Sequence, residues 1–447
     1  MAQIAEITID KLENGLRLAA EFYTAKSLIG SEYYFGKDII DFVQYGTSEE
    51  LNENQSGTPT LRLNEFDSIF LGEPSKYCDT LSEKTTKGLL VKKGDVLVCR
   101  TNGNPKLVGK AAIAQNNFDF VFASYLFRIR PKLGLLNPET LVVFLNSNIG
   151  RSEIEKNLMV SNQSNFSPAK FREIKIPIYD KSVQDKIKNM GFSASAKHSQ
   201  SKSLYAQAEQ LLVQELGLEN FVSEWTAGYA TDFNSILGSF RMDAEYFQPK
   251  YKIVEDKIRK YKNGWKYLPG LLKISKQKTE IDEEKTYQYI ELADINASLG
   301  IVNNTNKIIG ADLPSRAKMS LQKGDVVVSS VEGSIAKVAL IDQDIENLIG
   351  STGFFVLRTK EFSPEVNLIL CKSQIMQLLL AREAQGTILT AIPNKSLERV
   401  VVPFFTKEIQ TKLTSLVQES HKVLYESRQL LEQAKREVEE MIEAKAN

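Results

Sequence analysis

The stretch Arg172-Glu-Ile-Lys-Ile-Pro-Ile178 returns later in the chain as Glu398-Arg-Val-Val-Val-Pro-Phe404, where Pro403 follows Pro177 by 226 residues. Each copy is a short β-rich run that ends near a proline. The same offset relates two further pairs of segments: Asn137-Pro-Glu139 with Ser363-Pro-Glu365, and Leu204-Tyr-Ala-Gln-Ala208 with Leu430-Leu-Glu-Gln-Ala434. A repeat of this length is the size of a domain. The chain is therefore expected to contain two similar domains and two sites of one kind.

Upstream the repeat continues with small slips in spacing. Arg17-Leu-Ala-Ala-Glu-Phe-Tyr23 is similar to Arg241-Met-Asp-Ala-Glu-Tyr-Phe247, and Lys93-Gly-Asp95 is similar to Lys323-Gly-Asp325. The duplication thus reaches through most of both halves.

The composition allows large cores and leaves the overall charge balanced. Of 447 residues, 42% are hydrophobic, and the 56 basic residues equal the 56 acidic residues in number. A polyanionic partner would therefore have to be held by local basic patches. Residues 84–132 and 257–278 are such runs, and the second is interleaved with Tyr261, Trp265 and Tyr267. Each run also fits an ordinary solvated face rich in lysine.

Cysteine usage and hydropathy indicate the cellular compartment in which the protein acts. Cys78, Cys99 and Cys371 form no C-x-x-C pair and leave an odd count, and the N-terminus lacks a basic start followed by an apolar run. No stretch approaches the roughly 18 apolar residues that a membrane helix needs. We expect a soluble protein of the reducing cytoplasm.

Within each copy the order of elements can be predicted. The Lys-Gly-Asp turn leads into a buried strand, residues 96–99 or 326–328, and then into a polar loop, residues 100–106 or 329–334. A second strand and a helix opened by Asn-Pro-Glu or Ser-Pro-Glu follow, because the polar residue can cap the helix and proline suits its first turn. Each globular part is therefore expected to mix α and β structure.

Both copies end in a long segment almost free of glycine and proline. Residues 407–446 contain neither, and apolar or small residues recur there at alternate steps of four and three. Residues 183–216 carry a weaker version, which Gly191 interrupts. The pattern predicts a coiled coil, with an amphipathic helix lying on its own domain as the alternative. The predicted seam residues are Ile187, Leu204, Ala208, Leu413, Val417, Leu424, Leu431, Ala434 and Val438.

The sequence carries no catalytic signature. It has no adjacent prolines, which excludes the Pro-Pro loop of amino-methyltransferases, and it has no Gly-x-Gly and no Gly-Lys-Ser/Thr. His198 and His421 fall in the long helical segments, without cysteines or carboxylates at a metal-ligand spacing. Both are expected to be surface residues of these helices. The sequence therefore predicts no enzyme, no cofactor and no metal site.

The junctions into the two long segments carry a family resemblance. In the first copy, Phe171-Arg-Glu-Ile-Lys-Ile-Pro177 is followed by Val183-Gln184; in the second, Leu397-Glu-Arg-Val-Val-Val-Pro403 is followed by Ile409-Gln410. These motifs, with the Lys-Gly-Asp strand entries, resemble the specificity (S) subunit of type I restriction-modification systems over nearly the whole chain. The usual Pro-x-Pro-Pro is reduced here to single prolines, and the loop at residues 162–168 lacks the family's glycine.

The resemblance implies an α+β fold of two target recognition domains separated by two long helices that pack as an antiparallel coiled coil. Each domain would read one half of a split double-stranded DNA sequence, and the helices would set the distance between the halves. They would also dock methylation (M) subunits, which bring S-adenosylmethionine and adenine-N6 chemistry, and restriction (R) subunits would join this core. The implied bounds are residues 1–180 and 220–405 for the domains, and 181–219 and 406–447 for the helices.

Base-reading candidates are the polar and basic residues of the loops. Asn and Gln suit adenine edges, whereas Arg and Lys suit guanine and phosphate. The candidates are Arg100, Asn102, Asn104, Lys106, Lys110, Gln163 and Asn165 in the first copy, and Ser330, Lys337, Gln385, Thr387, Asn394 and Lys395 in the second. Ordinary loop polarity is the alternative for each of them. Because the copies place their basic runs differently, they should read different sequences.

Two other functions remain compatible with the sequence. One is a tandem-domain scaffold that assembles partners through its coiled coil without touching DNA. The other is a remnant nuclease or methyltransferase, against which the missing motifs argue.

Overall fold

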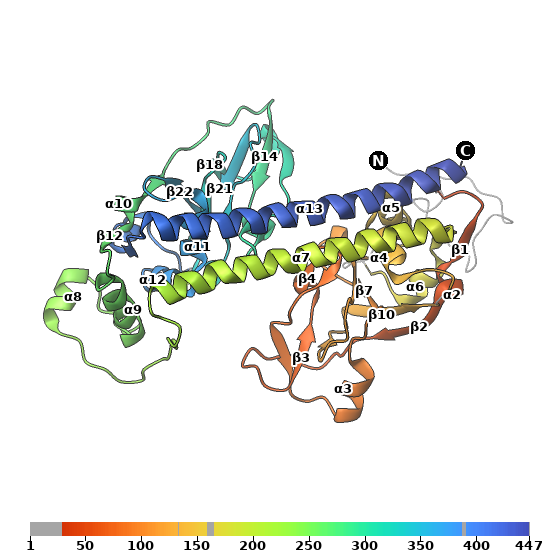
Figure 1. Cartoon of the computed structure of the whole chain (residues 1–447), viewed down its shortest axis with the longest axis horizontal. Coiled ribbons are helices and arrows are strands. Elements are labelled where there is room, and N and C mark those ends of the chain that lie inside the picture. Colours follow the sequence, from red (N-terminus) through yellow and green to blue (C-terminus); the bar gives the residue numbers. More distant parts are fainter. Residues whose placement is uncertain (1–28, 133, 159–164, 387–389, 447) are drawn as a thin grey trace. The chain divides into compact units, whose positions relative to one another are not determined.

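The computed structural model describes residues 29–132, 134–158, 165–386 and 390–446 (Figure 1). The repeated segment Arg17–Tyr23 lies outside these ranges. The chain divides into two compact units, with Met1–His198 and Tyr425–Asn447 in unit 1 and Ser199–Leu424 in unit 2. Each unit therefore contains one globular part and portions of both long helices.

Unit 1 is built on a six-stranded sheet with helices on one face and a smaller sheet on the other. The six strands, in order across the sheet, are β2 (Ile40–Tyr45), β10 (Leu126–Pro131), β7 (Val96–Cys99), β8 (Ala111–Ile113), β5 (Phe70–Leu71) and β4 (Phe66–Asp67). Val96 and Val98 of β7 pack with helices α4 (Pro138–Asn146) and α5 (Asn148–Asn157). Leu97 and Cys99 alternate to the other face, as the period of two in a strand requires.

The other face of this sheet carries a smaller, three-stranded sheet. Its strands lie in the order β6 (Lys76–Cys78), β3 (Thr58–Leu61) and β9 (Val121–Phe122), and helix α3 (Glu83–Leu89) follows β6 in the chain. Short helices α2 (Gly36–Ile39) and α6 (Pro168–Glu173) complete the unit.

Unit 2 repeats the six-stranded order. Its strands are β13 (Leu272–Ser275), β22 (Phe354–Thr359), β19 (Val326–Ser329), β20 (Val338–Leu340), β16 (Ile301–Val302) and β15 (Ile295–Asn296), with α11 (Pro364–Lys372) and α12 (Gln374–Arg382). Its smaller sheet has four strands, β17 (Asn306–Ile309), β14 (Thr286–Ile290), β21 (Leu348–Ser351) and β18 (Ala317–Ser320). The prediction of two similar domains of mixed α and β structure is thereby confirmed.

The repeated Lys-Gly-Asp turn has the same structural role in both units. Gly94 and Gly324 adopt φ angles of 85° and 90°, a left-handed conformation that glycine reaches without steric cost. The aspartate that follows is buried, and its carboxylate accepts a hydrogen bond from the backbone N–H of Lys92 in unit 1 (2.9 Å). Asp325 binds the N–H of Gln322 in the same way (3.0 Å). The turn therefore positions a buried carboxylate at the start of the central strand.

The partners of this carboxylate differ between the units. Asp95 binds Arg128 (Nη1–Oδ2 2.9 Å) and Arg130 (Nε–Oδ1 2.7 Å), whereas Asp325 binds Arg358 (Nε–Oδ1 2.9 Å). Arg128 is almost fully buried and also donates to the carbonyl oxygens at the end of α3. In unit 1 the ion pair thus anchors α3 as well as the sheet.

A strand pair and a glutamine form each entry into a long helix. β11 (Lys175–Pro177) pairs with β1 (Tyr33–Phe35), and β23 (Val401–Pro403) pairs with β12 (Trp265–Tyr267). In the first turn of α7 (Lys181–Glu215), the buried Gln184 donates to the carbonyl of Tyr179 (3.0 Å). In α13 (Lys407–Ala446), the buried Gln410 donates to the carbonyl of Phe405 (2.8 Å). The quoted junction motif is therefore a strand-to-helix joint that occurs twice.

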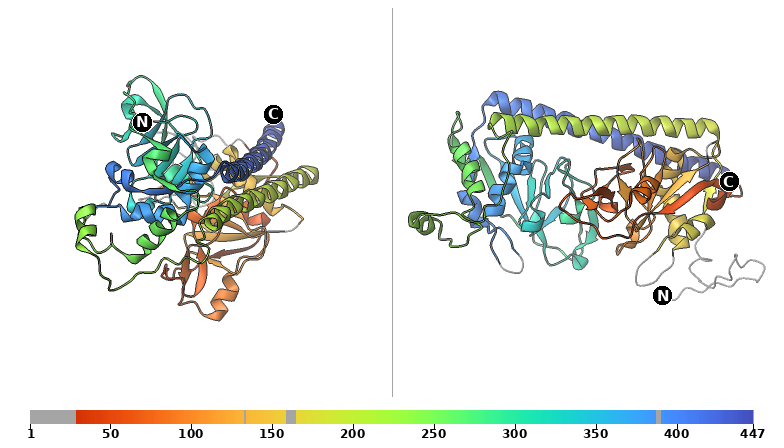
Figure 2. Two further views of the ribbon diagram at one scale, coloured as in Figure 1. Left: turned by 60° about the vertical axis from the view of Figure 1, so that its left-hand side comes forward. Right: turned by 90° about the horizontal axis from the view of Figure 1, so that it is seen from below.

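Portions of α7 and α13 pack against each other within each unit (Figures 1 and 2). In unit 1 the Ser427 hydroxyl donates to the carbonyl of Ala194 (2.7 Å), and in unit 2 the Ser420 hydroxyl donates to the carbonyl of Ser201 (2.8 Å). Hydroxyls reach a facing backbone only where the helices approach closely. The prediction that the long helices pack together is confirmed.

Buried positions recur along both helices at steps of four and three. They are Ile187, Gly191, Ala194, His198, Ser201, Tyr205, Ala208 and Leu212 in α7, and Leu413, Val417, Ser420, Leu424, Ser427, Leu431, Ala434 and Val438 in α13. Each α13 position follows its α7 counterpart by 226 residues. Leu204, expected in the seam, is half-buried, and the neighbouring Tyr205 is the buried residue.

The expectation that both histidines lie on the surface of their helices was wrong. His198 is 7% exposed, and its Nε2 lies 2.9 Å from Oδ2 of Asp67 on β4. His421 is half-buried, with its Nε2 3.0 Å from the carbonyl oxygen of Leu299. Both side chains face the globular part of their own unit, where a polar partner compensates for their burial.

Between α7 and the second globular part the chain forms a long connection. It contains α8 (Phe233–Ser239), which has no buried residue, and leads to α9 (Pro249–Arg259), which buries Tyr251, Val254 and Ile258. Helix α10 (Leu268–Leu271) precedes β13. In the ranges that the structure describes, no helix combines the length and apolarity required to cross a membrane.

Candidate nucleic-acid interface

The two polar loops chosen from the sequence meet in unit 1. The first loop leaves β7 at Arg100, and the backbone N–H of Phe166 donates to the Arg100 carbonyl (2.8 Å). Next to this bond Thr101 and Asn165 form an isolated antiparallel bridge. Segments more than sixty residues apart in sequence therefore form one surface at the end of the central strand.

The same two loops meet in unit 2. The N–H of Ile392 donates to the carbonyl of Ser330 (2.8 Å), and Val331 forms a bridge with Ala391. The N–H of Glu332 also donates to the carbonyl of Thr390 (3.0 Å). The paired loop is thus a shared feature of both units.

Arg100 is the first residue of the unit 1 loop after β7. Its guanidinium lies over the ring of Tyr45 at 5.2 Å from the centroid, and Tyr45, on the edge strand β2, is 45% exposed. A planar cation stacked on an exposed aromatic ring offers a flat surface with hydrogen-bond donors at its rim. Such a surface suits a base edge or a phosphate.

The two loop asparagines use their amide oxygens to shape the loop. Asn102 accepts from the N–H of Asn104 (2.8 Å), and Asn104 accepts from the N–H of Lys106 (3.0 Å), which caps the short 3₁₀ turn Pro105–Leu107. A carboxamide oxygen retains a second lone pair. Both side chains therefore remain compatible with an adenine edge.

The two candidate lysines of unit 1 have different surroundings. Lys106 is exposed, whereas Lys110 is half-buried. Burial lowers the pKa of the Lys110 ammonium, and the nearby Asp67 opposes this effect. Lys106 is therefore the better phosphate ligand.

The other two candidates of this loop pair lie close together in sequence. Gln163 lies outside the described residues. Asn165 is half-buried, and its Oδ1 has no hydrogen-bond partner within the described ranges.

Two unit 2 candidates already form hydrogen bonds to backbone carbonyls of their own unit. The hydroxyl of Ser330 donates to the carbonyl of Gly353 (2.9 Å), and the ammonium of Lys337 donates to the carbonyl of Ile295 (2.8 Å). Burial also lowers the pKa of Lys337, while Asp294 opposes this effect. These two residues are the weaker candidates for an outside ligand.

The remaining unit 2 candidates surround the loop pair. Gln385 is exposed, and its backbone pairs with Ala391 (2.8 and 2.9 Å). Asn394 and Lys395 are exposed at the start of the 3₁₀ helix Asn394–Arg399. Thr387 lies outside the described residues. The loop itself carries the exposed Glu332, which would repel a phosphate.

Cations of unit 2 gather instead beside the edge strand β13. A pocket of about 730 Å³ is lined there by Lys273, Lys276 and Lys360, together with Asn394, Thr359 and Tyr267. The three lysines are exposed, the Lys360 ammonium also donates to the carbonyl of Pro269 (3.1 Å), and one acid, Glu398, borders the pocket. This concentration of ammonium groups suits a sugar–phosphate backbone.

Only part of the basic run at residues 257–278 is available to such a ligand. Arg259 is paired with Glu255 and stacks on Trp265 (4.2 Å), and Lys262 pairs with Glu215 (2.9 Å). The run could be predicted from the sequence, but its paired members could not be distinguished there from Lys273 and Lys276. It missed Tyr45 and Lys360, for which no sequence signal exists.

Part of the chain matches a known protein family. Residues 29–190 match the family model described as the type I restriction modification DNA specificity domain. No curated protein matches the chain.

Similar solved structures align with 93–94% of the chain. The type I restriction-modification S subunit from M. genitalium is 14% identical, with 94% of this chain and 97% of that chain covered and a TM-score of 0.39. The HsdS subunit from Thermoanaerobacter tengcongensis is 13% identical, with 93% and 95% covered and a TM-score of 0.29. A chain from a study of type I R-M complex assembly is 13% identical, with 94% and 97% covered and a TM-score of 0.29.

Proposed function

Because the chain is a DNA specificity subunit of the type I restriction-modification family, we propose that each globular part reads one half of a split double-stranded DNA target. The family match covers the globular part of unit 1, and unit 2 repeats the strand order of the same sheet. A specificity subunit of this family is not itself catalytic. The observation that carries the proposal is the pair of polar loops that meets at the same place in both units.

In unit 1 we assign contacts by their surroundings. Arg100 on Tyr45, with Asn102 and Asn165, would face base edges, and the exposed Lys106 would bind phosphate. Lys110 would contribute less, because its ammonium is half-buried.

In unit 2 phosphate binding would shift to the edge strand. Lys273, Lys276 and Lys360 would hold the backbone, while Gln385 and Asn394 would read bases. A DNA strand at this pocket would avoid the acidic Glu332.

The long helices would connect the two DNA-reading globular parts and would dock methylation subunits. Restriction subunits would join this core. A helix rises about 1.5 Å per residue and resists bending, so it can hold the two parts at a fixed spacing and helical phase. The three free cysteines are buried, which suits the reducing cytoplasm in which such a complex would act.

Salt dependence and sequence preference test the contacts. Lys106→Ala in unit 1, or Lys273→Ala with Lys276→Ala in unit 2, should weaken binding to all DNA sequences. Each lost phosphate contact should flatten the log–log salt slope by about one unit. Asn102→Ala should change sequence preference instead. Equal losses on every sequence for all these variants would contradict the assignment, and weak binding unaffected by salt would favour a scaffold that does not recognise DNA.

The spacing role has its own test. One heptad added to each helix at facing points lengthens it by about 10 Å, or about three base pairs of B-DNA at 3.4 Å per pair. Together with its methylation subunits, this variant should recognise both half-sites with an altered spacing between them. Full activity at the original spacing would show that the helices do not set the distance.

A further inference from the structure

The connection between α7 and α9 exposes an unusual amount of apolar surface. The five most exposed large apolar side chains in the described ranges all lie between residues 222 and 242. They are Phe240 and Met242 (each 88% exposed), Val222 (70%), Phe233 (69%) and Trp225 (61%). Single exposed apolar residues are ordinary on protein surfaces, whereas clustered ones mark interaction sites. We call residues 222–242 the apolar arm.

Phe240 is held in a conformation that its side chain disfavours. It ends α8 with φ 55° and ψ 31°, and its N–H donates to the carbonyl of Ile236 (3.0 Å). This left-handed helix-end position normally belongs to glycine, because a Cβ atom is strained there. A phenylalanine that accepts this strain while its ring stays in solvent is poorly explained by the stability of the chain alone.

The arm is anchored to unit 2 at several points. Arg399 donates to the carbonyl of Ser239 (2.9 Å), and Arg241 donates to the carbonyl of Ala384 (3.2 Å). The side chain of Gln248 also binds both the N–H and the carbonyl of Thr226 (3.0 and 3.1 Å). Its apolar residues are therefore presented by a fixed backbone, which reduces the ordering cost of binding.

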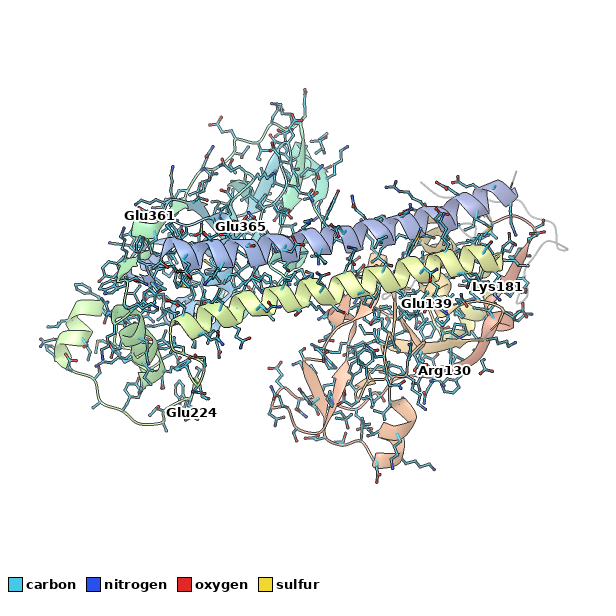
Figure 3. All side chains as sticks on the ribbon, in the orientation of Figure 1. Arg130, Glu139, Lys181, Glu224, Glu361 and Glu365 are labelled. Carbon is cyan, nitrogen blue, oxygen red and sulfur yellow. The ribbon has the colours of Figure 1, made fainter. Side chains whose placement is uncertain are left out.

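The charges around the arm indicate its partner. Residues 219–245 contain five acids, Glu219, Glu224, Asp232, Asp243 and Glu245, and one base, Arg241, which is paired with Asp243. Two further basic side chains contact the arm, Arg399 at Ser239 and Lys250 at the ring of Trp225, so acids still outnumber bases. Figure 3 labels Glu224 on this segment. The acidic character disfavours DNA as the ligand, since phosphates would be repelled. It fits a protein with an apolar groove and basic groups at its rim.

The repeat indicates how many partners there are. Phe240-Arg-Met242 corresponds to Leu16-Arg-Leu18 in the other copy of the motif, so an apolar–Arg–apolar triplet precedes each globular part. A partner that binds this motif would be present once per globular part. From these observations we propose that the apolar arm docks a methylation subunit, with Phe240 and Met242 as its anchors. This inference rests on the proposed function, which supplies that subunit.

Binding of the full chain to the purified methylation subunit of the same system tests the inference by calorimetry. Phe240→Gly keeps the backbone conformation and removes the ring, so the chain should fold at least as well as the wild type. Met242→Ser removes the second anchor. Each should weaken binding roughly 30-fold, the equivalent of a hot-spot loss of about 2 kcal/mol. Ile309→Ser, which changes an exposed apolar residue in the smaller sheet of unit 2, is the control and should bind normally.

The outcomes separate the inference from the function on which it rests. If the wild-type chain does not bind the methylation subunit, the proposed function fails. If it binds and both arm variants bind equally well, only the docking surface is refuted. A lowered melting temperature of Met242→Ser with unchanged subunit binding would show that the arm packs within its own chain, which also refutes the inference.

Discussion

Units 1 and 2 share the features that build the two paired polar loops at the end of the central strand. They differ in the side chains that these loops present. Both have a left-handed glycine, a buried aspartate, a central strand and a bridge between the two loops. In unit 1 the loop carries Arg100 and Lys106, whereas in unit 2 it carries Glu332 and the lysines lie beside β13. The shared part is required for folding. The loop side chains differ, as expected for two domains that recognise different DNA sequences.

The buried aspartate gives the largest expected difference between the units. On β10 Arg128 lies opposite Leu97, whereas on β22 Val356 occupies the corresponding position opposite Val327. Asp95→Ala would therefore leave Arg128 buried without its charge partner, at a cost of about 3–5 kcal/mol. Asp325→Ala leaves only the less buried Arg358, and should cost about 1–3 kcal/mol.

Hydrogen exchange measured separately for peptides of each unit can compare these two losses. The exposed Asp119→Ala is the control and should change little. A larger loss of protection in unit 2 than in unit 1 would contradict the role given to the buried Arg128.

The helix-entry glutamines give a second, smaller difference. Gln184 accepts from the N–H of Asn137 (2.8 Å) and donates to the carbonyls of Leu135 (3.1 Å) and Tyr179 (3.0 Å). Gln410 donates to the carbonyl of Phe405. Gln184→Ala should therefore cost about 2–3 kcal/mol and Gln410→Ala about 1 kcal/mol, because more buried backbone groups lose their partner in unit 1. Urea denaturation measures the free energy of unfolding of both variants. Equal losses would show that the two joints are equivalent and would contradict this difference.

The smallest difference concerns the packing of the two helices. Val417 is buried in α13, whereas its counterpart Gly191 in α7 borders an apolar cavity of about 220 Å³. A Cβ atom at Gly191 would come no closer than 3.7 Å to Glu139. Gly191→Ala should therefore stabilise unit 1 by about 1 kcal/mol through helix propensity. A lower melting temperature for this variant would show that the cavity does not accept the added methyl group.

Sequence patterns predicted the duplicated strands and turns better than the buried positions where α7 packs against α13. The duplicated strands and turns carry apolar runs and glycines whose geometry is local, so their place could be predicted. Half of the α7 seam is small or polar, as at Gly191, Ser201 and His198, and apolar periodicity therefore selected Leu204 beside the buried Tyr205. The 226-residue offset applied to α13 would have identified the correct register.

The candidate site was predictable in outline only. The loops could be chosen by composition, but their meeting depends on bridges between distant segments, as between Thr101 and Asn165. The inward position of Lys110 and Lys337 depends on tertiary burial, which a loop composition does not encode.

The central claim is that each unit reads its own half of the target. It can be tested by mapping methylated adenines across a genome in cells that contain the methylation subunits and the chain with Asn102→Ala and Asn165→Ala. The account predicts that one half-site changes or loses stringency, while the other half-site and the spacing stay the same. Methylation that changes in both half-sites, or in neither at full activity, would contradict it.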